Sequence, residues 1–164
     1  MGVVILGGGG DRSRGRLVPG VGHLYRGDEL SQGFSVLAVG RSQMTDEQYR
    51  QLMKEALREF GEEPFDEKLW DEFSRNLFFL RGVFEEDESY RRLSQRLDEV
   101  SPSEEKGERN VIYYMAVPAG EMPVLVEKLK QHTLCKGAFK PKVIVEKPFG
   151  RDRASAVELN RLLT

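Results

Sequence analysis

The sequence predicts an α/β fold with a doubly wound, mainly parallel sheet of about five strands and flanking helices. Three observations support this prediction. Short apolar runs of strand length alternate with longer helical patterns along the chain. The first apolar run is followed at once by four glycines at residues 7–10. A chain of 164 residues that is 39% hydrophobic and 32% charged also fits one globular domain.

The first elements follow in the order strand, glycine turn, helix, strand. Residues 3–6 are an unbroken apolar run, typical of a strand buried on both faces of a parallel sheet. Residues 11–26 are basic and interrupted by glycine, and we expect them to form the first crossover helix. Residues 34–39 are apolar except for Ser35 and are followed by Gly40, and they predict the second strand.

The clearest helix pattern begins at Thr45. Thr45 and Gln48 have the spacing of a capping box, in which each side chain binds the other residue's backbone N–H group. Residues suited to a buried face follow at helical intervals: Tyr49, Leu52, Met53, Ala56, Leu57 and Phe60. We expect Pro64 to end this helix. A shorter helix should follow, with Leu69, Trp70 and Phe73 on one face.

The middle of the chain contains a strand, a helix and a loop. Residues 77–80 predict the third strand, and residues 89–100 predict a helix. The acidic residues 85–88 are most simply a solvated helix start, because carboxylates suit the positive end of the helix dipole, and a metal site is the alternative. The polar residues 101–110 predict a loop or linker.

The last third of the chain repeats the alternation. Residues 111–115 and 143–145 predict the fourth and fifth strands, and residues 124–130 predict a helix after Pro123. Asp152 is in place to cap a final helix that carries Val157, Leu159, Leu162 and Leu163. Strands that alternate with helices favour parallel pairing through right-handed crossovers.

Composition limits the partners and the location. The net charge of −2 gives no overall basic field for nucleic acid. No apolar run is long enough to cross a bilayer and the N-terminus lacks a signal pattern, so we expect no membrane association. Because Cys135 is the only cysteine, no internal disulfide can form, and we expect a cytoplasmic protein. Cys135 is then a structural or surface thiol, with a catalytic thiol as the alternative.

The glycines at residues 7–10 are the first candidate site. Glycine lets the backbone turn tightly and approach a ligand closely, and the next helix start offers unpaired N–H groups to a pyrophosphate. Their position after an apolar strand favours a dinucleotide site over a plain tight turn. We reject a nucleotide-hydrolase phosphate loop: Gly10 and Gly15 have its spacing, but Arg16 and Leu17 stand where lysine and serine or threonine are needed.

The end of the second predicted strand bears on which dinucleotide binds. A carboxylate there would bind the ribose hydroxyls of NAD and repel the 2′-phosphate of NADP. This chain has Arg41 and Ser42 after Gly40, and no acid. An arginine fork beside a hydroxyl suits a phosphate, so we favour NADP as the cofactor, with an ordinary exposed arginine as the alternative.

A second ligand edge is predicted at residues 146–150, Glu-Lys-Pro-Phe-Gly, because they follow the fifth strand. Residues 7–25, 40–42, 113–118 and 146–152 together resemble the N-terminal coenzyme domain of glucose-6-phosphate dehydrogenase, and bacterial members in particular. The resemblance covers essentially the whole chain. Its most specific part is the sequence of residues 143–152.

The resemblance implies one Rossmann-like dinucleotide-binding domain over residues 1–164. The family oxidises glucose 6-phosphate at C1 with NADP, giving the lactone in the pentose phosphate pathway. Lys147 is implied as the catalytic and substrate-binding residue, because a mobile cation with three donors suits sugar and phosphate oxygens, and Pro148 would fix its turn. The residues expected to bind the cofactor are Gly7, Gly8, Gly9, Gly10, Asp11, Arg12, Arg14, Arg41, Ser42 and Lys147.

The chain also departs from the family pattern. Arg12 replaces a leucine, Gly15 a basic residue and Gly20 an alanine, and Gly22 adds a further break. Each glycine destabilises a helix by about 1 kcal/mol relative to alanine.

In the family, the histidine base, its orienting aspartate, the substrate domain and any oligomer interface lie beyond the lysine motif. We expect neither His23 nor His132 to replace that base. The chain is therefore expected to be a truncated form that binds NADP weakly and does not oxidise glucose 6-phosphate alone. A non-catalytic NADP-binding module is the alternative.

Overall fold

The computed structural model describes residues 1–9, 34–61, 64–101, 109–132, 134, 139–145 and 152–163. Its strands are β1 (Gly2–Leu6), β2 (Ser35–Gly40), β3 (Leu77–Arg81), β4 (Arg109–Met115) and β5 (Phe139–Val145). Its helices are α2 (Asp46–Phe60), α3 (Glu67–Ser74), α4 (Asp87–Val100), α5 (Met122–Gln131) and α6 (Arg153–Leu163). The predicted first crossover helix and Cys135 lie outside the described residues.

The five strands form one parallel sheet in the order β3-β2-β1-β4-β5. The chain moves outward from β1 to β2 and β3, and then returns to the other side of β1 for β4 and β5. At the carboxyl end of β1, Leu6 lies opposite Val39 of β2 and Met115 of β4. This reversal of strand order beside β1 is the switch point at which open α/β sheets bind ligands.

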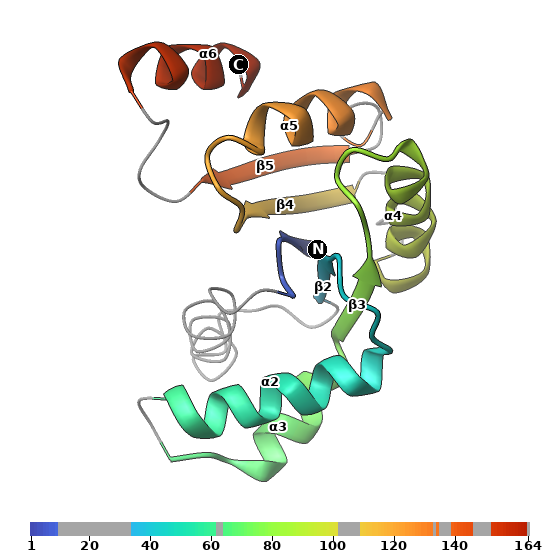
Figure 1. Cartoon of the computed structure of the whole chain (residues 1–164). Coiled ribbons are helices and arrows are strands. Elements are labelled where there is room, and N and C mark those ends of the chain that lie inside the picture. Colours follow the sequence, from blue (N-terminus) through green and yellow to red (C-terminus); the bar gives the residue numbers. More distant parts are fainter. Residues whose placement is uncertain are drawn as a thin grey trace.

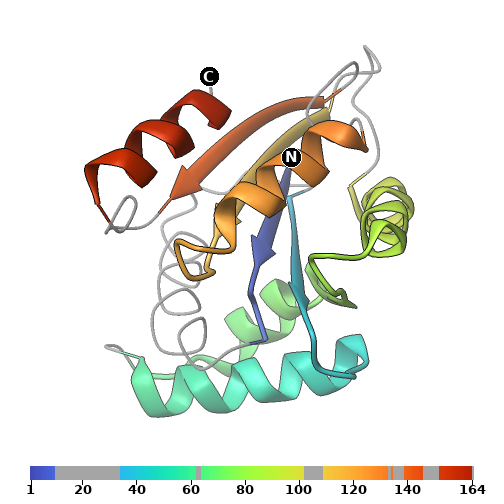
Figure 2. The ribbon, with the colours of Figure 1, turned by 45° about the horizontal axis from the view of Figure 1, so that its top comes forward.

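Helices cover both faces of the sheet. One core joins Val4 and Leu37 to side chains of α4, α5 and α6, and a second core joins Ile5 and Val36 to side chains of α2 and α3. Figure 1 and Figure 2 show α2 and α3 side by side, away from α5 and α6. Because alternate residues of a strand point to opposite faces, this arrangement confirms the predicted doubly wound, Rossmann-like fold.

Helix α2 begins as the sequence predicts and ends earlier. The backbone N–H of Gln48 donates to Thr45 Oγ1 at 3.1 Å, and that of Thr45 donates to Gln48 Oε1 at 2.9 Å, which completes the capping box. The helix ends at Phe60, and Gly61 is its C-cap, so it stops before Pro64. Glycine has a low helix propensity, which favours an end at this position. Phe60, predicted on the buried face, is 49% exposed.

Strands β4 and β5 begin before the predicted residues. Arg109 was expected in a loop, but it starts β4 with its side chain only 6% exposed. Its guanidinium donates to Asp98 Oδ1 at 2.6 Å, and this pairing allows a buried cation at the start of a strand. Strand β5 includes Pro141, which is tolerated because β5 lies at an edge of the sheet.

The predicted cap of the last helix is confirmed. The backbone N–H of Ser155 donates to Asp152 Oδ1 at 2.8 Å, just before α6 begins. Within the described ranges, no helix has both the length and the apolar character needed to span a membrane.

Candidate functional site

The candidate site lies at the carboxyl edge of the sheet, where several predicted site residues come together. Gly7, Gly8 and Gly9 form a turn directly after β1, and Arg41 and Ser42 directly follow β2, the strand beside it. The other predicted site residues lie outside the described residues: Gly10, Asp11, Arg12, Arg14 and Lys147.

Backbone hydrogen bonds hold the glycine turn against β2, and a close approach of the backbone sets it against the end of β4. The N–H groups of Gly7 and Gly8 both donate to the carbonyl of Val39, at 2.9 and 3.0 Å. Gly7 has a φ of +92°, and a Cβ added to it would lie 2.5 Å from the carbonyl oxygen of Ala116, directly after β4. Only glycine fits this left-handed and crowded position without a shift of the backbone.

A buried tyrosine supports the same turn from α2. The hydroxyl of Tyr49 donates to the carbonyl of Gly8 at 3.3 Å, and its ring packs on Phe79 with centroids 5.0 Å apart. Tyr49 was predicted only as a core residue. Tyr49 therefore packs in the core and also positions the glycine turn through its hydroxyl.

Arg41 is brought beside the turn by a close approach of two backbones. A Cβ added to Gly40 would lie 3.0 Å from the nitrogen of Gly9 and 3.2 Å from its Cα. Contacts this short are tighter than most real Cβ contacts. The backbone of Gly40 therefore packs against Gly9, so that Arg41 leaves β2 next to the glycine turn.

The edge also contains two charged residues that the sequence did not identify as site residues. Glu85 Oε1 lies 3.3 Å from Arg41 Nη2, with the two side chains 59% and 62% exposed. Arg81 Nε donates to the carbonyl of Arg41 at 3.3 Å. Arg81 ends β3, so its position at the end of a strand could have identified it, as it did Arg41. Glu85 lies further along, between β3 and α4, and has no such signal in the sequence.

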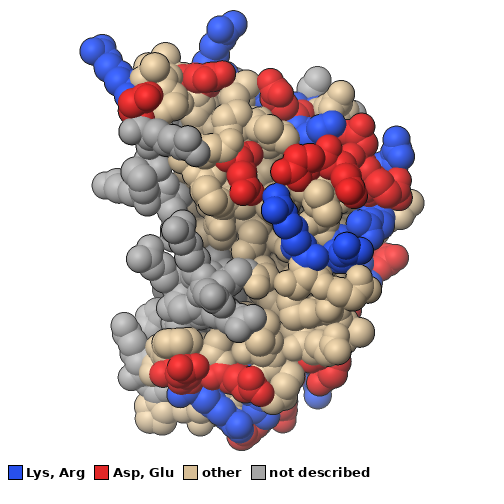
Figure 3. Space-filling view, in the orientation of Figure 1, with Lys and Arg blue, Asp and Glu red and all other residues tan. Residues whose placement is uncertain are grey.

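The acidic residues 85–88 divide between two roles. Asp87 and Glu88 form the acidic first turn of α4, as predicted for a solvated helix start, whereas Glu85 precedes the helix and pairs with Arg41. Figure 3 shows acidic and basic side chains interleaved over α4 and its surroundings. Among the described residues, no group of three or more His, Cys, Asp or Glu side chains is placed to hold a metal ion.

His132 lies between α4 and α5 and contacts residues of α4. Its Nε2 atom lies 2.9 Å from Asp87 Oδ1, and its ring stacks on Tyr90 with centroids 5.4 Å apart. The hydrogen bond from His132, followed by that from Lys128, lowers the pKa of Asp87 to about 2. Burial raises the pKa of Tyr90, whose hydroxyl donates to the carbonyl of Phe84 at 2.7 Å. These contacts fasten the end of α5 to the start of α4.

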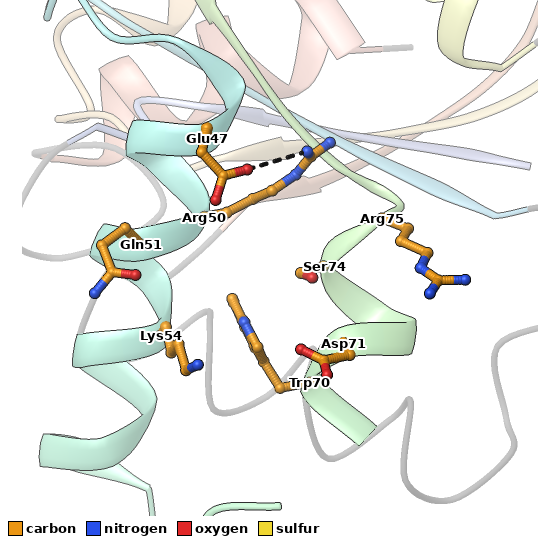
Figure 4. Close-up of a pocket in the computed structure, with 8 residues that line it drawn as sticks. All are labelled: Glu47, Arg50, Gln51, Lys54, Trp70, Asp71, Ser74 and Arg75. Atoms are coloured by element: carbon orange, nitrogen blue, oxygen red, sulfur yellow. Dashed lines mark ion pairs between the residues drawn. The ribbon is translucent and has the colours of Figure 1, made fainter. Parts of the chain in front are cut away.

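A separate cavity of about 370 Å³ lies between α2 and α3 (Figure 4). Its walls are Glu47, Arg50, Gln51, Lys54, Trp70, Asp71, Ser74 and Arg75. Arg50 Nε donates to the carbonyl of Leu77, the first residue of β3, at 3.0 Å. The cavity therefore lies toward the amino end of β3, whereas the candidate site lies at the carboxyl end of the strands.

The whole chain is similar to glucose-6-phosphate dehydrogenases. Residues 4–164 match the family described as "Glucose-6-phosphate dehydrogenase, NAD binding domain". The chain is 32% identical to glucose-6-phosphate 1-dehydrogenase of Chlamydia pneumoniae over 167 residues, which cover 98% of this chain and 32% of that relative. It is 32% identical to glucose-6-phosphate 1-dehydrogenase 2 of Mycobacterium tuberculosis strain CDC 1551 / Oshkosh, with 98% and 31% covered.

Solved structures agree with these similarities. The glucose-6-phosphate 1-dehydrogenase of Mycobacterium avium superposes with a TM-score of 0.84 at 28% identity, over 99% of this chain and 33% of that one. A glucose-6-phosphate dehydrogenase in complex with its substrate glucose-6-phosphate superposes with a TM-score of 0.86 at 30% identity, with the same coverage. The chain thus spans about a third of the length of its relatives. With its fold and its match over residues 4–164, the chain belongs to the glucose-6-phosphate dehydrogenase family and corresponds to the coenzyme-binding domain.

Proposed function

We propose that residues 1–164 form a single dinucleotide-binding domain that binds NADP at the carboxyl edge of its sheet and prefers it to NAD. The position of Arg41 beside the glycine turn carries this proposal. A dinucleotide that lays its pyrophosphate along the turn would present its adenosine ribose to the end of β2. At that position, the guanidinium of Arg41 and the hydroxyl of Ser42 could both donate hydrogen bonds to a 2′-phosphate.

The glycines contribute to this site in two different ways. Because the N–H groups of Gly7 and Gly8 already donate to Val39, these residues shape the turn and do not bind the pyrophosphate through their amides. We assign pyrophosphate binding to residues 9–14, which contain the predicted Gly9, Gly10, Asp11, Arg12 and Arg14. The helix predicted from the sequence over residues 11–26 would suit this role through the unpaired N–H groups at its start.

The family supports a wider proposal for the protein that contains this domain. We propose that it transfers a hydride from C1 of glucose 6-phosphate to NADP, in the pentose phosphate pathway and in the cytoplasm. A related structure is described as a complex with glucose-6-phosphate. Strand β5 ends at Val145, at the same sheet edge as the glycine turn, and Lys147 follows two residues later. Lys147 is the proposed contact to substrate, and any homo-oligomer would form through the part of the family that this chain does not span.

Titration calorimetry with NADP and NAD tests the cofactor proposal on this chain. The wild type should bind NADP more tightly than NAD. Arg41→Ala should weaken NADP binding by about tenfold or more, since charge-assisted hydrogen bonds contribute about 1.5–3 kcal/mol, and should leave NAD binding nearly unchanged. Arg91→Ala is the matched control, because Arg91 has a similarly exposed ion pair, with Glu88 at 3.0 Å. Equal affinities for NADP and NAD in the wild type would overturn the proposed preference, and unchanged NADP binding in Arg41→Ala would overturn the role of Arg41.

A non-catalytic NADP-binding module is the second candidate, favoured by Arg12, Gly15, Gly20 and Gly22, which depart from the family pattern. Turnover of the full-length gene product with glucose 6-phosphate separates the two. An enzyme should reduce NADP and lose that activity in Lys147→Ala. NADP binding without turnover would favour the module.

A further inference from the structure

Arg41 pairs with a carboxylate of the same protein. Its Nη2 atom lies 3.3 Å from Glu85 Oε1, across 44 residues of sequence. Among the described residues, Glu85 is the carboxylate that pairs with Arg41. The next residue, Glu86, forms no ion pair with any described residue. The donors proposed to bind a 2′-phosphate therefore face a competing anion from the same protein.

Backbone contacts fix the segment that carries Glu85. The N–H of Gly82 donates to the carbonyl of Gly40 at 2.8 Å, so the chain leaving β3 is tied to the residue just before Arg41. The N–H of Val83 donates to Ser89 Oγ at 2.8 Å, and Tyr90 holds the carbonyl of Phe84. Glu85 is thus held next to Arg41 from both sides, by β2 and by α4, although both charged side chains are more than half exposed.

A carboxylate at this position has opposite effects on the two dinucleotides. It repels the 2′-phosphate of NADP and competes for the Arg41 guanidinium, and it offers an acceptor to the ribose hydroxyls of NAD. We infer that Glu85 is a specificity-determining residue that reduces the preference for NADP set by Arg41. This inference rests on the proposed function, because it concerns the same adenosine-ribose end of the site.

The size of the effect follows from the exposure of the pair. An ion pair in water contributes from about 0.2 to about 1 kcal/mol, so a phosphate can displace Glu85 from Arg41 without a large penalty. Removing the charge of Glu85 should therefore raise NADP affinity by about 1.4- to fivefold. The same change should leave NAD affinity unchanged or lower it, since it removes a hydroxyl acceptor.

The test compares Glu85→Gln with Glu86→Gln on the full chain, by titration calorimetry with NADP and NAD. Glu86→Gln removes the same charge one residue away, at the N-cap of α4, where Glu86 makes no side-chain capping bond. The expected result is a higher NADP-to-NAD affinity ratio in Glu85→Gln and an unchanged ratio in Glu86→Gln. Added salt should reduce the difference between Glu85→Gln and wild type, because the pair is exposed.

Each other outcome has a definite meaning. An unchanged or lower ratio in Glu85→Gln, or an equal rise in Glu86→Gln, would overturn the inference while leaving NADP binding as the proposed function. The wild type could bind NADP and NAD equally well, while Glu85→Gln binds NADP more tightly than NAD. That result would support the inference and overturn the proposed NADP preference of the wild type. Binding of neither dinucleotide by a folded wild type would overturn both.

Discussion

Replacing Gly7 with alanine tests whether the glycine turn sets the geometry of the sheet edge. Gly7 has a φ of +92°, and an added Cβ would lie 2.5 Å from the carbonyl oxygen of Ala116 and 3.0 Å from its carbonyl carbon. Gly9 belongs to the same turn, but a Cβ there would meet Phe79 at an ordinary 3.6 Å. Gly9→Ala is therefore the matched control, the same chemical change in the same turn without the clash.

The expected loss for Gly7→Ala has two parts. A residue with a Cβ in a left-handed conformation loses about 1–2 kcal/mol. The backbone at Ala116 must also move, which weakens its hydrogen bond to the carbonyl of Leu6, 2.8 Å long, and such a bond contributes about 0.5–1.5 kcal/mol. We expect the free energy of unfolding to fall by about 2–3 kcal/mol in Gly7→Ala. In Gly9→Ala it should change by less than about 1 kcal/mol.

Urea unfolding followed by circular dichroism measures both variants. With a slope of about 2 kcal/mol per M, the loss in Gly7→Ala corresponds to a midpoint lower by about 1 M or more, with the slope unchanged. A midpoint within about 0.3 M of wild type would refute the reasoning. An equal loss in Gly9→Ala would also refute it, because any Cβ in the turn would then be harmful, whatever its contact with Ala116.

Two further predictions concern side chains around the site. Tyr49→Phe removes the hydroxyl that donates to Gly8 and keeps the ring contact with Phe79, so urea unfolding should show a loss of about 1 kcal/mol; no loss would mean that the hydroxyl does not stabilise the turn. The pKa of Asp87, about 2 instead of 3.8, favours the charged form in the folded state, so its stabilising effect is present above the ordinary pKa and is lost as the pH falls through about 2. Carboxyl NMR titration should find this low pKa in the wild type and a higher one in His132→Ala; an identical pKa in the two would contradict the role of His132.

Local signals in the sequence predicted most of the fold. The capping box of Thr45 and Gln48 and the cap at Asp152 depend on residues three apart, and both are confirmed. Element ends were less predictable. Arg109 has the character of a loop residue unless its partner Asp98 is known, and the helix ends at Gly61, which comes before the stronger helix breaker Pro64.

The candidate site was predicted only in part, for a similar reason. The glycine turn and Arg41 could be found because each directly follows an apolar strand. Glu85 could not be paired with Arg41 from sequence, because β2 and β3 bring together residues 44 positions apart. Its acidic neighbours also suggested a helix start, and that interpretation holds for Asp87 and Glu88.

Because Gly7 and Gly8 both donate to the carbonyl of Val39, we expect their backbone to move with the sheet and not as a free loop. Their amide protons should exchange with solvent only when the sheet edge opens, and not at the rate of a free loop. The conformational entropy of this segment is then lost during folding, so a dinucleotide does not have to order it again on binding. Cofactor binding and folding are thereby linked thermodynamically, because only the folded domain has the site. A substitution in a distant helix that lowers the folded fraction would reduce the measured cofactor affinity, although the sheet edge itself is unchanged.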